Sequence, residues 1–382
     1  MTAALALDRP ISMLPVLRAA DCIPTHASVE PCVLDVGSPR LVARGAVAIL
    51  LALRHARIGS GAEVLVPAFN CPSMIAPVRA AGAEAVPYAI NADLSIDTAS
   101  LERLITSRTR ALLAAHLLGR IGDLADIKAM CEQRGIILIE DCAHTFFGAN
   151  AAGPVGTTGH YAVASPRKFF PIAEGGLLTS RTRDLSELSL PAASWGRTMQ
   201  SALRMIDTAV EFGHMRAFAP LLALAKSLRS TVRGKVAAHS AAGAQGAEDA
   251  YDIPLDVRRC VGLAGGAGAG RYLFNVGLIA ARRRNYEQLA NGIRGSAAAR
   301  VLDMPPVSTF VPYVVPVLLA DPQRHFPQLK QLGVPMWRWE YSLQGVCKVT
   351  DHYSQSLIQL PCHQSLRPHE LERIVEAVRS LQ

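Results

Sequence analysis

Residues 44–180 alternate between amphipathic segments and short apolar runs. Segments in which apolar residues recur with a period near 3.6 predict helices over 45–55, 72–81, 99–105 and 123–134. The short runs predict strands over 63–66, 84–88, 111–116, 136–140, 160–164 and 176–179. Two of these runs, ALLAAH and IILIE, are almost continuously apolar, as expected for strands that are buried on both faces. The pattern predicts an α/β fold with a mainly parallel sheet sandwiched by helices.

The rest of the chain divides by composition into segments of different character. Residues 184–236 contain many arginines and have helical periodicity but no clear strand. Residues 237–270 are rich in alanine and glycine. Beyond it we expect a helix over 271–294, a strand over 313–319 and a final helix over 368–381. The predicted parts are an N-terminal segment (1–40), a large domain (41–236) with a helical insertion (184–236), a Gly/Ala-rich connection (237–270) and a small α+β domain (271–382).

Composition excludes several classes of protein. Hydrophobic residues make up 50% and charged residues 18%, which excludes a disordered chain. No run of 18 or more uncharged apolar residues occurs, so we expect no membrane span. The apolar start, Met1 to Leu7, has no basic region before it and is followed by Asp8 and Arg9, so we expect a cytoplasmic protein rather than an exported one.

The positive charge of the chain is carried mostly by arginine. The formal net charge is +8, and only six of the 39 basic residues are lysine. Arginine binds phosphate or carboxylate in a bidentate manner, which favours an anionic small molecule or an acidic carrier as partner. Aromatic residues are only 5% and do not alternate with basic ones, so nucleic acid is not expected. The eight cysteines show no C-x-x-C spacing, so we expect reduced thiols and no metal site.

One lysine stands out as a possible covalent anchor. Lys168 follows the strand predicted over 160–164, has Arg167 beside it, and precedes a Glu-Gly-Gly turn. Burial and a neighbouring guanidinium lower the pKa of an amine, so such a lysine can attack a carbonyl as the free base. The other five lysines lie in apparent helices or polar segments. The run 282–284 (Arg-Arg-Arg) is expected to be a solvated helix face.

A carboxylate and a helix start complete the candidate site. Asp141 ends the buried strand IILIE, at the strand end where α/β sheets bind ligands, and a carboxylate there would keep a pyridine nitrogen protonated. His144 would reach the oxygen on such a ring. From these residues alone, a loop-initiating aspartate and a surface histidine are an equally open alternative. The amides of Ala46 and Val47 open the helix over 45–55 and would cradle a phosphate.

In this combination the sequence resembles the DegT/DnrJ/EryC1/StrS family of aminotransferases that depend on pyridoxal 5′-phosphate (PLP) and have the aspartate aminotransferase (type I) fold. The resemblance covers 41–180 and the carboxyl end, and is poor over 184–300. The matching segments, in family order, are RGAVAILLAL (44–53), GAEVLVPAFNCPSMIAPVRAAG (61–82), TRALLAAHLLGRIGDLADIKAMCEQRGIILIEDCAHTFFGA (109–149), VGTTGHYAVASPRKFFPIAEGG (155–176) and LPCHQSLRPHELERIV (360–375).

The resemblance implies roles for individual residues. Lys168 matches the Schiff-base lysine, Asp141 the partner of the pyridinium nitrogen, and His144 the residue near O3′, which is more often glutamine in the family. Ala46 and Val47 match the amides at the phosphate. Ser165 matches the phosphate-binding hydroxyl, although it precedes the lysine by three residues where common members have five.

The sequence also departs from the family pattern. Cys71 replaces the aromatic residue that usually stacks on the cofactor ring, and Phe69 is a possible substitute. The G-x-N-x-R segment with which a neighbouring subunit often reaches the phosphate is missing, and residues 267–275 occupy its general region. The resemblance still implies a homodimer.

The resemblance implies amino transfer from an amino acid, glutamate or glutamine as in the family, to a keto or aldehyde acceptor such as a nucleotide-linked keto sugar. Two alternatives stay open. One is different PLP chemistry, either dehydration or the transamination of a cyclitol or carrier-bound intermediate. The other is a non-catalytic family member.

Overall fold

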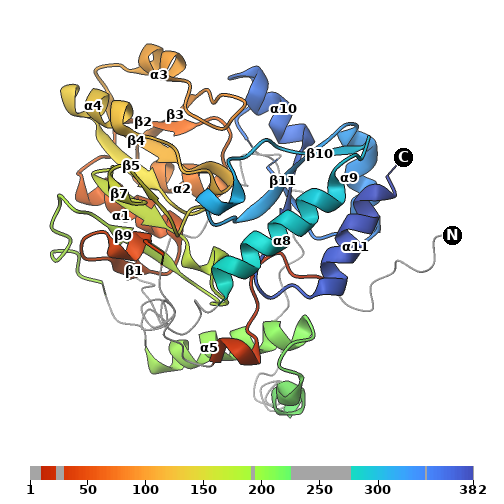
Figure 1. Cartoon of the computed structure of the whole chain (residues 1–382). Helices are drawn as coiled ribbons and strands as arrows, with labels where there is room; N and C mark the ends of the chain where they lie inside the picture. The colour runs from red at the N-terminus through yellow and green to blue at the C-terminus, as the bar shows by residue number, and fades with distance from the viewer. Residues whose placement is uncertain (1–9, 23–29, 191–193, 225–276, 340–341, 382) are drawn as a thin grey trace, which may run out of the picture.

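Two sheets organise the chain. The computed structural model describes residues 10–22, 30–190, 194–224, 277–339 and 342–381. Within them, a seven-stranded sheet and a four-stranded sheet occupy opposite halves of the molecule in Figure 1. A two-stranded ribbon, β6 (Ala149–Asn150) with β7 (Gly153–Pro154), completes the strands.

The larger sheet has the strand order β1-β9-β8-β5-β4-β2-β3. Five neighbouring strands in it are parallel, and β9 pairs antiparallel with both β8 and β1. Parallel strands need crossover connections, which helices supply here. The strands are β1 (Arg40–Val42), β2 (Glu63–Pro67), β3 (Glu84–Tyr88), β4 (Thr109–Ala115), β5 (Ile137–Asp141), β8 (Tyr161–Ala164) and β9 (Gly176–Thr179).

Four helices cover this sheet, namely α1 (Gly45–His55), α2 (Pro72–Ala80), α3 (Thr98–Leu104) and α4 (Ala125–Gln133). α1 packs against α2 and over β8 and β9, while α3 lies on β3 and α4 on β5. All residues of α1 from Ala46 to Leu53 are buried, which explains its continuous apolar sequence. The predicted α/β fold is confirmed, and the predicted helices and strands of this half end within two residues of those observed.

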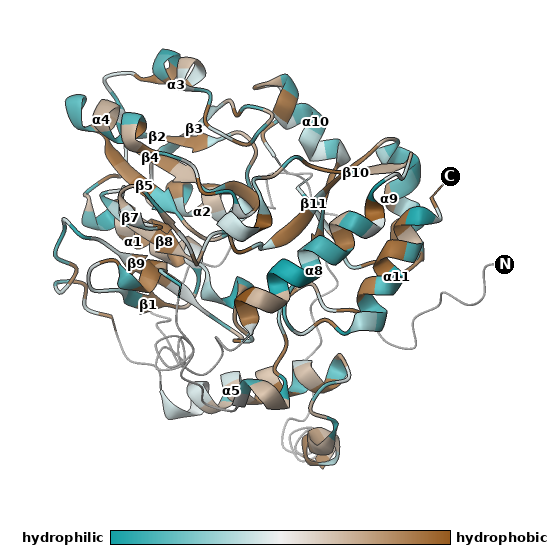
Figure 2. Ribbon diagram, in the orientation of Figure 1, coloured by the Kyte–Doolittle hydropathy of each residue, from teal (hydrophilic) through white to brown (hydrophobic). Residues whose placement is uncertain are grey.

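The smaller sheet is antiparallel, with the order β10-β11-β13-β12. α8 and α11 pack against each other, and α8 also covers β10 and β11. Figure 2 shows apolar residues along the strands and polar residues on the outer side of these helices. The elements are β10 (Ala299–Val301), β11 (Val314–Leu319), β12 (Trp337–Arg338), β13 (Leu357–Pro361), α8 (Leu278–Ile293), α9 (Pro322–Gln331), α10 (Lys348–Ser356) and α11 (Pro368–Arg379).

The segment after β9 is helical where it is described, with α5 (Trp195–Glu211) and further helical residues at 219–224. α5 lies below both sheets in Figure 1. The predicted connection 237–270 lies outside the described residues. None of the helices in the described ranges is both long enough and apolar enough to cross a membrane. Short 3-10 turns are η1 (Ala19–Cys22), η2 (Val33–Asp35), η3 (Leu117–Gly119), η4 (Pro166–Lys168), η5 (Arg216–Phe218) and η7 (Val307–Thr309).

Candidate active site

A cavity of about 190 Å³ opens at the carboxyl end of β5 and reaches the turn after β8. It is the place where α/β sheets usually bind ligands. Six of the eight residues predicted for the site line it, whereas Val47 and Phe69 do not. The lining residues are Arg44, Gly45, Ala46, Ile49, Cys71, Ser73, Met74, Asp141, Ala143, His144, Ser165, Arg167, Lys168, Tyr313, Trp337 and Trp339.

Lys168 ends the 3-10 turn η4, which Pro166 starts directly after β8. Its amide donates to the Ser165 carbonyl over 3.0 Å, which fixes the turn. The ammonium nitrogen lies 5.2 Å from the centre of the Tyr313 ring. Burial lowers the pKa of Lys168, and the Arg167 guanidinium lowers it further, although Cys71 and Asp141 act in the opposite direction. The environment therefore increases the fraction of free amine at neutral pH.

Asp141 is the last residue of β5, and its carboxylate faces the same cavity. One oxygen, Oδ1, accepts the amide of Ala143 over 2.8 Å, which holds the side chain at the sheet edge. Burial raises the pKa of Asp141, whereas the charge of Lys168 lowers it. The structure thus brings a half-buried lysine and a buried carboxyl group to one cavity, as the sequence predicted.

His144 contributes a neutral imidazole. Its ring stacks on Tyr313 with the centroids 4.4 Å apart. Nδ1 accepts the Leu118 amide over 3.1 Å, so the ring proton lies on Nε2, which remains able to donate. Burial lowers the pKa of His144 well below its usual value, and the charge of Lys168 adds to the effect. This histidine is therefore a hydrogen-bond donor without charge.

The first turn of α1 and the end of β8 form another wall of the cavity. Ala46 lines it, and its amide has no backbone acceptor among the described residues, as is typical of a first helical turn. The Val47 amide instead donates to the Arg44 carbonyl over 3.1 Å. Ser165 is buried and lines the same cavity, close to Gly45. Of the groups that were predicted to bind a phosphate, the Ala46 amide and the Ser165 hydroxyl thus lie at the cavity.

The two candidates for ring stacking lie in different surroundings. Cys71 caps α2 and lines the cavity, and burial raises the pKa of its thiol. Phe69 is fully buried, and its ring packs 4.8 Å from that of Trp339. Phe69 therefore does not line the cavity, but it packs against Trp339, which does.

Three aromatic residues of the cavity were not predicted, namely Tyr313, Trp337 and Trp339. They come from the smaller sheet and the chain beside it, so the cavity lies between the two halves of the molecule. The ring centroids of Trp339 and His144 lie 5.4 Å apart, and those of Trp337 and Tyr313 lie 6.4 Å apart. The sequence Trp-Arg-Trp indicates that Trp337 and Trp339 lie on the same side of the chain, because side chains two residues apart in an extended segment point to the same side.

Arg282 of α8 corrects one expectation. The run 282–284 was expected to be solvated, yet Arg282 is fully buried. Its guanidinium donates to the carbonyl of Lys168 over 2.8 Å and to that of Pro312 over 3.0 Å. It also lies 4.7 Å over the ring of Phe169. The helix therefore holds the backbone of the candidate catalytic lysine through a buried cation.

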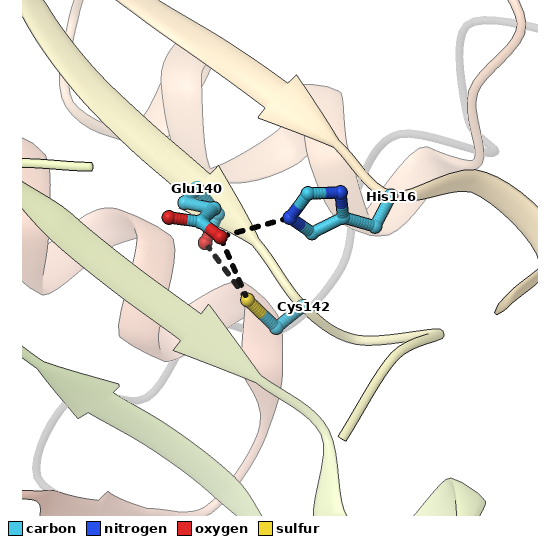
Figure 3. A group of neighbouring side chains, drawn as sticks. All are labelled: His116, Glu140 and Cys142. Carbon is cyan, nitrogen blue, oxygen red and sulfur yellow. Dashed lines mark hydrogen bonds and ion pairs between the residues drawn. The ribbon is translucent and has the colours of Figure 1, made fainter. Parts of the chain in front are cut away.

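Glu140 and Cys142, the neighbours of Asp141 in sequence, form a buried network with His116, which Figure 3 shows. His116 Nε2 lies 2.8 Å from Glu140 Oε1, and its Nδ1 accepts the Gly122 amide. Burial raises the pKa of the Cys142 thiol well above its usual value, which disfavours the thiolate that a metal would need. The three groups fit a hydrogen-bond network that supports the end of β5.

Glu140 also ties β5 to the loop before β8. Its two oxygens accept three backbone amides, those of Gly156, Thr158 and Gly159, over 2.7–3.0 Å. A Cβ at Gly159 would lie 2.5 Å from the Tyr161 carbonyl, so no larger residue fits against the carboxylate. Burial alone raises the pKa of Glu140, but the hydrogen bonds, led by that from His116, outweigh it and leave the pKa lowered.

Replacing Glu140 with glutamine is expected to lower the free energy of unfolding by about 3 kcal/mol at pH 7, because an amide cannot accept all four donors. A lowered carboxyl pKa stabilises the fold above the pKa of about 4.3 in the unfolded chain, and this contribution is lost as the pH falls through the folded pKa. The difference between the two proteins should therefore shrink towards pH 4.

Urea denaturation at pH 7 and at pH 4 measures both effects. Glu132→Gln is the matched control, because Glu132 is exposed on α4 and forms an ion pair with Lys128 over 3.1 Å. We expect it to change the unfolding free energy by less than about 0.5 kcal/mol. Equal stability of both variants at pH 7 would refute the assigned role of Glu140.

Comparison with known proteins adds to this geometry. Residues 41–214 match the sequence model of the DegT/DnrJ/EryC1/StrS aminotransferase family. A putative L-glutamine:3-amino-2,3-dideoxy-scyllo-inosose aminotransferase of Micromonospora echinospora is 32% identical over 165 residues, which are 41% of this chain and 38% of the relative. GDP-perosamine synthase of Vibrio cholerae is 31% identical over 152 residues, 39% of this chain and 41% of the relative. The chain thus matches about two fifths of the length of these relatives.

The fold is similar over a longer part of the chain. A solved structure of a putative sugar aminotransferase from Streptococcus pneumoniae, in its apo-form, superposes with a TM-score of 0.65 and covers 97% of both chains. Its sequence identity is 16%, so this similarity shows the fold alone. The matched region 41–214 holds Asp141 and Lys168, whereas the three aromatic residues of the cavity lie outside it.

Proposed function

We propose that the chain, whose residues 41–214 match the model of the DegT/DnrJ/EryC1/StrS aminotransferase family, belongs to that family and is a PLP-dependent aminotransferase. It transfers an amino group from an amino acid, glutamine or glutamate, to a keto or aldehyde acceptor such as a keto sugar or a cyclitol. The observation that carries the proposal is the meeting of Lys168 and Asp141 in one cavity at the carboxyl edge of the sheet.

The residues of the cavity fit pyridoxal 5′-phosphate. Bound PLP supplies an aldehyde that takes up the amino group and a ring that accepts electrons when a proton leaves carbon. Asp141 would hold the ring nitrogen in its protonated form, and His144 would donate from Nε2 to the ring oxygen. The Ala46 amide and the Ser165 hydroxyl would bind the phosphate. Val47 extends this helix turn, Cys71 faces the ring, and Phe69 supports Trp339.

Lys168 has two tasks in this proposal. As a free amine its Nζ would hold the cofactor through the aldehyde, and the same nitrogen, once released, would take up and return the proton that leaves the substrate carbon. Both tasks need an unprotonated amine, which the lowered pKa of Lys168 favours. Asp141 keeps its charge when it faces a cationic ring nitrogen, because an opposite charge offsets the cost of burial.

Incubation with PLP and L-glutamine tests the reaction class. We expect pyridoxamine phosphate to accumulate to about one equivalent per active site, because no acceptor is present to consume it. Adding scyllo-inosose or a nucleotide-linked keto sugar should then return the cofactor to PLP. A dehydrated product without pyridoxamine phosphate would indicate the alternative PLP chemistry. Failure to bind PLP would indicate a non-catalytic protein and refute the proposal.

We further propose a homodimer located in the cytoplasm. The large apolar side chains that are exposed among the described residues all lie in the helical segment after β9, namely Trp195, Met199, Phe218, Leu221 and Leu224. Exposed apolar patches of this kind are typical of protein interfaces. Light scattering of the purified chain tests the proposal, and the mass of a monomer would contradict it.

A further inference from the structure

The imidazole of His144 is held by groups from both halves of the molecule. Its Nδ1 accepts the Leu118 amide over 3.1 Å, its plane lies 20° from that of the Tyr313 ring, and Trp339 is tilted beside it at 36°. Leu118 belongs to η3 of the larger half, whereas Tyr313 directly precedes β11 and Trp339 follows β12. The orientation of this imidazole therefore depends on contacts that the smaller half supplies.

Tyr313 is itself fixed close to the candidate catalytic lysine. Its carbonyl accepts a hydrogen bond from the Arg282 guanidinium over 3.3 Å, and the same guanidinium donates to the Lys168 carbonyl over 2.8 Å. The ring centre of Tyr313 lies 5.2 Å from the Lys168 nitrogen, within the range of a cation–π contact. One buried cation thus joins the backbones of the tyrosine and the lysine, and the tyrosine ring connects the lysine with His144.

The stack also keeps water away from one face of the imidazole. His144 and Tyr313 are both buried. Burial lowers the pKa of His144, and the charge of Lys168 acts in the same direction. A neutral imidazole that accepts at Nδ1 carries its proton on Nε2. Removal of the tyrosine ring would therefore free the imidazole to rotate and would admit water that stabilises the charged form.

We propose that Tyr313 is a positioning residue of the active site, whose ring holds the His144 imidazole so that Nε2 stays available as an uncharged donor. The consequence for the reaction rests on the proposed function, in which Nε2 donates to the ring oxygen of the cofactor. The stack itself does not depend on that function. Because Tyr313 acts through its ring, phenylalanine can replace it and an aliphatic residue cannot.

Nuclear magnetic resonance of the full chain, labelled at histidine and tyrosine, tests the stack directly. We expect a nuclear Overhauser contact between ring protons of His144 and Tyr313 in the wild type, both before and after PLP is added. His144→Asn identifies the histidine signal by its loss. As the pH falls, this signal should remain that of a neutral imidazole while exposed histidines become charged.

Three variants separate the ring from the hydroxyl and from a general loosening of the fold. Tyr313→Leu should raise the titration midpoint of His144 towards that of exposed histidines, and Tyr313→Phe should restore the wild-type behaviour. Tyr286→Leu is the matched control, because Tyr286 is a buried tyrosine of α8 that packs on Phe310 and does not line the cavity. It should leave the His144 signal unchanged.

A rate measurement connects the stack with the reaction. In a single turnover of the PLP-loaded protein with L-glutamine, Tyr313→Leu should lower the maximal rate about tenfold, the effect of one neutral hydrogen bond. The glutamine concentration that gives half of this rate should not change, because the imidazole does not bind the amino acid. Tyr313→Phe should restore the rate.

Three results would overturn the proposal. One is the absence of a contact between the two rings in the wild type. Another is a His144 midpoint in Tyr313→Leu that equals that of the wild type. A third is an equal shift in Tyr286→Leu, which would assign the effect to loosening of the smaller half. If Tyr313→Leu does not fold, Tyr313→Met and the ring contact in the wild type decide. Failure to bind PLP would refute the proposed function alone, since the resonance measurements need no cofactor.

Discussion

Replacing Lys168 with alanine is expected to abolish covalent attachment of PLP and to lower the rate of amino transfer by at least about a thousandfold. Among the described residues that line the cavity, the other basic side chains are Arg44, Arg167 and His144, and none of them carries a primary amine. Borohydride reduction followed by intact-mass measurement reports the attachment directly. The wild type should gain the mass of one reduced cofactor, and the variant none.

Two further variants separate attachment from chemistry. Lys330→Ala serves as the control, because Lys330 is exposed near the end of α9, and it should keep both the mass gain and the activity. Asp141→Asn should keep the mass gain but lose most of the activity, since a neutral amide does not hold a ring nitrogen in its protonated form. A full mass gain in Lys168→Ala would disprove the assignment of the lysine.

Six of the seven strands of the larger sheet were predicted from sequence, and the central ones are recognisable because they are buried. The edge strand β1 is only partly buried and was not predicted. Buried parallel strands read as continuous apolar runs, and β4 and β5 carry such runs between helices with a clear period. The short strands β10 and β12 were not predicted. Each has only two or three residues, and the pairing that defines it joins residues far apart in the chain. No local pattern encodes such pairing.

The candidate site, like the fold, has residues that could be predicted from sequence and residues that could not. The meeting of Asp141 and Lys168 could be predicted because Asp141 ends β5 and Lys168 lies in the turn after β8, and the carboxyl ends of both strands lie at the cavity. Tyr313 could not, since its approach to His144 depends on how the two sheets pack.

Arg282 shows where a local interpretation was wrong although the sequence held a signal. A run of three arginines favours a solvated face, but the helical period places Arg282 on the same side as Leu278, Asn285 and Leu289, which are all buried. The apolar period of the whole helix therefore predicts the burial of Arg282 better than the two arginines that follow it do. This burial has consequences for both stability and the candidate site.

Arg282→Met is expected to lower the free energy of unfolding by about 3–5 kcal/mol, as measured by urea denaturation. Methionine fills much of the space, but it leaves the carbonyls of Lys168, Pro312 and Tyr313 without a donor in the interior. Burial lowers the pKa of Arg282 to about 10, so the cation that these carbonyls stabilise persists at neutral pH. The loss should also loosen the Lys168 turn and reduce the fraction of PLP that borohydride fixes, measured where the variant is still folded.

Two substitutions distinguish charge from geometry and position. Arg282→Lys keeps the charge but has no planar fork, and a single ammonium cannot reach all three carbonyls, so its stability should lie between those of the wild type and the methionine variant. Arg284→Met is the matched control in the same run, because Arg284 is exposed, and it should change the unfolding free energy by less than about 0.5 kcal/mol. If Arg282→Met were as stable as Arg284→Met, the burial cost of the cation would equal the stabilisation from its hydrogen bonds. Arg282 would then have no net role in holding the Lys168 turn.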